Sequence, residues 1–105
     1  MKAHADQGFA SFAEFFPFYL SEHANRKCRR LHFIGCTLGL ACLAALLVTG
    51  NFWWLLAGLV AGYGCAWIGH FGFEKNRPAT FKYPFYSFAG DWVMYWRMLT
   101  GKISF

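Results

Sequence analysis

Charged and apolar residues divide the chain into three parts. Between Leu31 and Phe73 there is no Lys, Arg, Asp or Glu. Within this stretch, residues 33–49 and 52–69 are apolar runs that meet at the turn-forming sequence Thr-Gly-Asn, residues 49–51. In helical conformation each run would be about 26 Å long, close to the roughly 30 Å hydrocarbon core of a bilayer. The pattern therefore predicts a helical hairpin that crosses the membrane twice.

The segments on either side of the hairpin predict two further helices. Aromatic residues recur every three or four positions from Phe9 to Leu20, which indicates an amphipathic helix that lies in the membrane interface or docks on the hairpin. Near the other end, we predict a short interfacial helix that runs to Leu99, with Asp91 as its N-cap rather than as a metal ligand. Residues 78–90 contain prolines and a glycine and are predicted as loops.

The composition supports a membrane protein. The chain is 57% hydrophobic and 22% aromatic, and its charged share is 14%, against about 25% in typical soluble proteins. A chain of 105 residues is too short to bury this much apolar surface within itself. Two helices that are apolar all round would also need more surrounding protein than a soluble bundle of this length supplies. We therefore expect one all-α integral membrane domain over residues 1–105, with membrane lipid as a partner.

The distribution of charge bears on partners and orientation. The formal net charge is +5, yet the aromatic residues lie in apolar runs and not among basic residues, so we do not expect nucleic acid binding. Basic residues flank both ends of the hairpin, whereas its turn carries no charge. They are Arg26, Lys27, Arg29 and Arg30 before it, and Lys75, Arg77 and Lys82 after it. The positive-inside rule then places both termini in the cytoplasm.

Small residues in both apolar runs predict close helix packing. Gly35 and Gly39 in the first run, and Gly58 and Gly62 in the second, have the four-residue spacing that lets helix backbones approach in lipid. We favour packing within the hairpin and leave association into homo-oligomers open. The four cysteines form no C-x-x-C pair and are expected to be free thiols.

Two histidines and one carboxylate form a candidate metal site. His32 and His70 each lie nineteen residues from Asn51, so an antiparallel hairpin places them at the same height on its cytoplasmic rim. Glu74 follows His70 by four residues and would share its helical face. Two histidines and one carboxylate with open positions suit a non-haem Fe(II) oxygenase. Taken singly, each histidine is more often a hydrogen-bonding residue than a metal ligand.

His23 joins this site only if the chain turns sharply before the first span. In a continuous helix it would lie on the opposite face from His32, roughly 13 Å away. Asn25 is the best candidate for the break, as the N-cap of the spanning helix. We interpret Arg26 and Arg77 first as topology and lipid-phosphate residues, and second as partners of a substrate carboxylate.

Three stretches of the chain carry a family resemblance. They are FYLSEHANRKCRRLHFIG (residues 18–35), AWIGHFGFEKNRPATFKYP (residues 66–84) and SFAGDWVMY (residues 87–95). They contain the motifs H-x-N-R-x5-H-x2-G, G-H-x3-E-x-[NR]-x-P-A and S-x2-G-D. With these motifs the chain resembles the Mpo-like family of small membrane proteins over nearly its whole length.

The resemblance implies an activity and a set of site residues. Characterised members of the family are Fe(II)-dependent dioxygenases that shorten 2-hydroxy fatty acids by one carbon in the breakdown of a long-chain base. His23, His32 and His70 match the motif histidines, and Glu74 matches the motif carboxylate. The implied substrates are a 2-hydroxy fatty acid and dioxygen. Two alternatives stay open: a small haem-binding protein, since two histidines at one height can ligate a haem, and a non-catalytic membrane protein whose rim binds lipid head groups.

Overall fold

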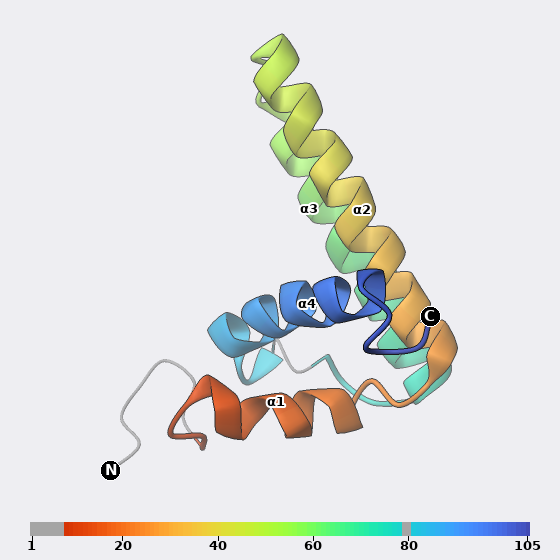
Figure 1. Ribbon diagram of the computed structural model, residues 1–105. Coiled ribbons are helices and arrows are strands. Elements are labelled where there is room, and N and C mark those ends of the chain that lie inside the picture. Colours follow the sequence, from red (N-terminus) through yellow and green to blue (C-terminus); the bar gives the residue numbers. More distant parts are fainter. Residues whose placement is uncertain (1–7, 79–80) are drawn as a thin grey trace.

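All regular elements in the described part of the chain are helical. The computed structural model describes residues 8–78 and 81–105. In order, the elements are α1 (Phe12–Ser21), α2 (Arg26–Thr49), α3 (Trp53–Ile68), the π-helical η1 (Gly69–Glu74) and α4 (Pro84–Leu99). Figure 1 shows α2 and α3 as a long antiparallel pair, with α1 and α4 lying across the base of that pair. The predicted all-α fold is confirmed.

The chain breaks between α1 and α2 where the sequence predicts it. The Asn25 side chain accepts hydrogen bonds from the amides of Lys27, at 2.8 Å, and Cys28, at 3.3 Å. Asn25 itself has extended backbone angles, as an N-cap requires. The cap of α2 is thereby confirmed, and it leaves His23 in the turn between the two helices.

Small residues bring α2 and α3 into close contact. A Cβ atom added at Gly35 would lie 3.0 Å from the Gly62 carbonyl oxygen, and one added at Gly58 would lie 3.1 Å from the Cβ of Cys42. At the turn, Gly50 adopts a left-handed conformation with φ of 69°, which a glycine tolerates without strain. The predicted small-residue packing within this pair is confirmed, and all four cysteines are free.

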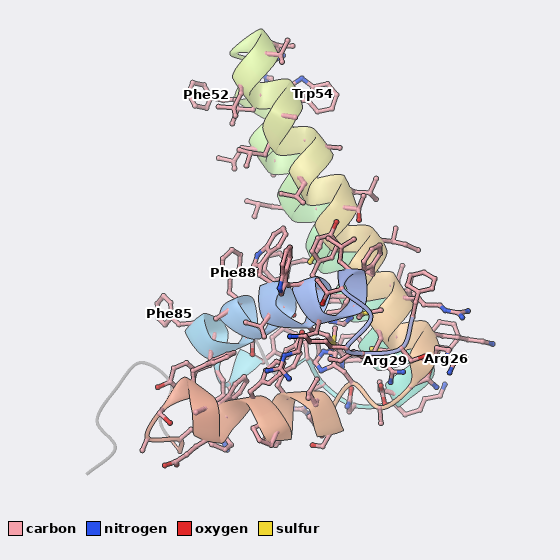
Figure 2. All side chains as sticks on the ribbon, viewed as in Figure 1. Arg26, Arg29, Phe52, Trp54, Phe85 and Phe88 are labelled. Atoms are coloured by element: carbon pink, nitrogen blue, oxygen red, sulfur yellow. The ribbon has the colours of Figure 1, made fainter. Side chains whose placement is uncertain are left out.

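Most of the surface of the α2–α3 pair is apolar and exposed. The segments Arg26–Thr49 and Trp53–Glu74 are long and apolar enough to cross a membrane, and only 11% and 17% of these spans are buried within the structure. Figure 2 shows Phe52 and Trp54 projecting from the tip of the pair. The core helix of a soluble protein would be mostly buried, so these two spans differ from such a helix.

The core of the protein lies between α1 and α4. Phe15 and Tyr19 of α1 are fully buried, and they pack with Met94 and Met98 of α4 in one hydrophobic cluster. The aromatic helix therefore docks on α4, and it ends at Ser21, one residue after the aromatic pattern that predicts it.

The prediction that α4 begins at Asp91 is wrong. The helix begins at Pro84, and residues 85–90 are helical rather than loop. A proline fits the first turn of a helix because its fixed φ matches and its missing N–H would have no partner there. Asp91 thus lies in the middle of α4, while the end of the helix at Leu99, followed by Gly101 in a left-handed conformation, agrees with the prediction.

Gly90 of α4 lies against the ring of Tyr19 in α1, and we expect Gly90→Ala to destabilise the protein. A Cβ atom at this position would lie 2.8 Å and 2.9 Å from two ring carbons of the buried Tyr19. Overpacking of this kind costs about 1–3 kcal/mol. Unfolding in detergent, followed by circular dichroism, measures the change. The control is Gly64→Ala, which meets no atom within 4 Å; equal stability of the two variants would contradict the expectation.

Candidate metal centre

Three buried histidines from three segments meet at the base of the α2–α3 pair. His23 lies in the turn after α1, His32 in the second turn of α2, and His70 in η1. They are 2%, 5% and 2% exposed. The Nε2 atom of His23 lies 3.2 Å from Nε2 of His32 and 2.9 Å from Nε2 of His70. One ligand atom from each histidine lies within 4.8 Å of the others, so the three could hold one metal ion.

Hydrogen bonds at the opposite ring nitrogens orient all three imidazoles. Nδ1 of His23 lies 2.6 Å from the Tyr19 carbonyl oxygen, and Nδ1 of His32 lies 2.9 Å from the Cys28 carbonyl oxygen. Nδ1 of His70 lies 2.7 Å from Oδ1 of Asn76. Each of these partners accepts, so each Nδ1 carries the proton and each Nε2 has a free lone pair.

A second hydrogen bond fixes which way the Asn76 side-chain amide points. Its Nδ2 donates to the Glu22 carbonyl oxygen at 3.2 Å, which leaves Oδ1 as the atom that faces His70. The Asn76 amide therefore connects η1 to the end of α1 and fixes the tautomer of His70 at the same time.

The three Nε2 atoms are in the protonation state that suits a shared cation. Burial, and then the neighbouring His32 and His70, hold the pKa of His23 well below its usual value, so this imidazole is neutral at pH 7. Neutral imidazoles with Nε2 free are the form that ligates metals. Two nitrogens bound to one ion at right angles, about 2.1 Å from it, are about 3.0 Å apart. The separations of 2.9 Å and 3.2 Å match this arrangement.

The ring orientations favour a single ion over a haem. The three rings are nearly perpendicular to one another, with interplanar angles of 86°, 79° and 90°. Two axial haem ligands need a slot for the porphyrin between them. Here the imidazoles contact one another directly, with centroids 4.4 Å to 5.0 Å apart.

Glu74 lies outside this group of three. Its Oε2 accepts a hydrogen bond from the Asn25 amide at 2.6 Å. It lies beyond His70 along the chain and faces the start of α2, where the helix dipole and several basic residues attract a carboxylate. The structure thus brings together His23, His32 and His70 and places Glu74 beside them, and its role as a metal ligand stays a prediction.

The two arginines predicted to bind a substrate carboxylate lie on the surface. Arg26 and Arg77 are both exposed, and the Arg26 guanidinium donates to the Ser104 hydroxyl at 3.3 Å. Figure 2 shows Arg26 and Arg29 at the base of the pair, far from its tip. Arg29 donates to the carbonyl oxygens of His23 and Ala24 and so holds the turn that carries the first imidazole. The predicted role of Arg26 and Arg77 stays a prediction.

A tyrosine and an aspartate lie next to the histidines. The ring of Tyr19 stacks on His23 with centroids 4.0 Å apart, and its hydroxyl donates to Asp91. Burial raises the pKa of Asp91 to about 7, while the hydrogen bond from Tyr19 lowers it. Burial and the nearby Asp91 raise the pKa of Tyr19 well above its usual value, so the phenol keeps its proton.

A small cavity of about 20 Å³ adjoins the cluster. All three histidines line it, together with Tyr19, Asp91 and Ser87. The Ser87 side chain is buried and its hydroxyl has no hydrogen-bond partner in the described part of the protein. A buried hydroxyl without a partner is costly, so this group is available to a polar atom of a ligand.

The sequence interpretation gave no role to Asn76, Tyr19 or Ser87. Asn76 and Ser87 both lie within the motifs of the second and third stretches, G-H-x3-E-x-[NR]-x-P-A and S-x2-G-D. Their place in these motifs was the signal by which the sequence could have identified them as site residues. Tyr19 was counted only as one of the aromatic residues of an apolar helix face, and its pairing with Asp91 spans 72 residues.

Fold and site together define a small helical protein in which three buried histidines, at the base of two apolar helices, could hold a metal ion. The chain belongs to the family described as 2-hydroxy-palmitic acid dioxygenase Mpo1-like, which it matches over residues 9–103. The predicted family is confirmed. No curated protein and no solved structure matches the chain.

Proposed function

We propose that the protein is an Fe(II)-dependent dioxygenase that shortens 2-hydroxy fatty acids by one carbon. The convergence of three buried histidine Nε2 atoms carries this proposal, because together they could hold one metal ion. Imidazole suits several first-row metals, and the family description names a dioxygenase of a 2-hydroxy acid. Iron follows from the motif resemblance, since the characterised members that these motifs resemble depend on Fe(II).

The proposal places the α2–α3 pair across a membrane, with both termini and the histidines on the cytoplasmic side. The exposed apolar surface of the pair supports the spanning arrangement, and the basic residues at its base support the orientation. Phe85 and Phe88 project from α4 on the side toward which the pair extends (Figure 2), which suits an α4 lying in the membrane interface.

His23, His32 and His70 would hold the ion, and Fe(II) supplies the activation of dioxygen when it is bound. The residues around the ion determine which other molecules reach it. The cavity of about 20 Å³ leaves little room for bulk water. The unpaired Ser87 hydroxyl would donate a hydrogen bond to an oxygen of the substrate head group. Tyr19 donates a hydrogen bond to Asp91 beside the site.

The test supplies purified full-length protein in detergent with Fe(II), dioxygen and 2-hydroxypalmitic acid. We expect mass spectrometry to detect the fifteen-carbon fatty acid, and we expect its formation to stop when the iron is chelated. A chain that binds iron and gives no shorter acid with any 2-hydroxy fatty acid would contradict the proposed function. The metal content, measured separately, tests the site itself.

A further inference from the structure

A second, larger cavity of about 250 Å³ runs between α2 and α3. Four residues line both this groove and the small cavity at the histidines: His32, Tyr63, Ala66 and Asp91. The groove therefore begins at the candidate metal centre. Beyond its base it is lined by Leu and Gly residues of the two helices, with Trp54 and Leu46 toward the tip.

The length of the groove matches a long acyl chain. His32 and Leu46 are fourteen residues apart on α2, which corresponds to about 21 Å along the helix. A hydrocarbon chain in staggered conformation advances by about 1.25 Å per carbon. A chain of about sixteen carbons therefore reaches from the histidines to the tip of the groove.

We propose that this groove binds the acyl chain of the substrate, with the polar head at the three histidines, and that residues along α2 select the chain length. The inference rests on the proposed function. A fatty acyl chain is the occupant that fits, because the groove is apolar along its length and polar only where it joins the candidate metal centre.

Gly39 offers a way to shorten the groove without disturbing the fold. It lines the groove, and a Cβ atom added there meets no atom within 4 Å. It lies seven residues after His32 on α2, about 10 Å along the helix. A leucine at this position would occupy the groove itself, so chains of up to about eight carbons would still fit.

The first measurement compares kcat/KM for 2-hydroxypalmitic and 2-hydroxyoctanoic acid in the full-length protein. We expect Gly39→Leu to lower the value for the sixteen-carbon acid by about tenfold or more and to leave the eight-carbon acid within about threefold. The matched control is Gly64→Leu, since Gly64 also has no atom within 4 Å of an added Cβ and does not line the groove. An unchanged ratio of the two substrates in Gly39→Leu would overturn the inference.

The second measurement does not depend on turnover. A 2-hydroxypalmitic acid with a diazirine near its methyl end is photo-crosslinked to the protein, and the labelled residues are mapped by mass spectrometry. We expect labelling at Leu46 and Trp54 in the native protein and its loss in Gly39→Leu. Labelling on the outer surface at Leu47 and Val48, or labelling that a phospholipid displaces as readily as unlabelled 2-hydroxypalmitic acid does, would overturn the inference. Groove labelling without turnover would support the acyl site and contradict the proposed reaction.

Discussion

The His70→Ala protein is expected to lose both the iron binding and the dioxygenase activity that we propose for the native chain. The substitution removes one of three converging Nε2 atoms and leaves His23 and His32 as a buried pair 3.2 Å apart. Loss of a residue that merely supports a ligand costs about 10–100-fold in metal affinity, so loss of the ligand itself should cost more. Iron content by elemental analysis and product formation by mass spectrometry measure the two effects on the same sample.

The matched variant for this experiment is Glu74→Gln. Its amide oxygen can still accept from the Asn25 amide, so the start of α2 is kept while the negative charge is removed. Retention of iron in Glu74→Gln together with its loss in His70→Ala would assign the metal to the histidines alone. Equal loss in both variants would make Glu74 a ligand, as the sequence predicts. Full iron content in folded His70→Ala, with the fold checked by circular dichroism, would contradict the site.

Asn76→Ala is expected to weaken metal binding although Asn76 would not itself ligate the metal. Its Oδ1 accepts from Nδ1 of His70 at 2.7 Å and so keeps the proton away from Nε2. Without this acceptor the His70 ring is free to rotate and to change tautomer. We expect a loss of about 10–100-fold in affinity, measured by titrating the apoprotein with Fe(II) under anaerobic conditions.

Asn76→Asp separates orientation from packing in this experiment. The carboxylate keeps an acceptor for His70 and loses the donor to the Glu22 carbonyl oxygen. We expect affinity within a few-fold of the native protein. If Asn76→Ala binds iron as tightly as the native chain, the hydrogen bond does not position the ligand.

Local patterns allowed the positions of the histidines to be predicted. The equal spacing of His32 and His70 from the turn fixes their common height once the helices are antiparallel. The cap at Asn25 is likewise local, since an Asn side chain can satisfy the amides at the start of its own helix. Together these two features predicted that His23 could lie beside His32 and His70.

The contacts that the sequence did not reveal join distant segments. Tyr19 of α1 donates a hydrogen bond to Asp91 of α4. The Glu74 carboxylate accepts one from the Asn25 amide, 49 residues earlier in the chain. Neither follows from periodicity, because periodicity gives the face of a helix and not its partner. The start of α4 was misplaced for a related reason: Pro84 and Gly90 are common in loops, yet one suits a first turn and the other is required by the ring of Tyr19.

The location of His23 outside any helix bears on how the protein matures. The three imidazoles come from segments up to 47 residues apart, so an ion shared by them ties the α1 turn to both long helices. Binding to the folded chain alone adds about 2.7 kcal/mol of stability at a free ion concentration one hundred times Kd. The α2–α3 contact at Gly35 and Gly62 does not include the ion. On the proposed function, α2 and α3 can therefore pair before the metal binds, and the bound metal then fixes the α1 turn to both helices.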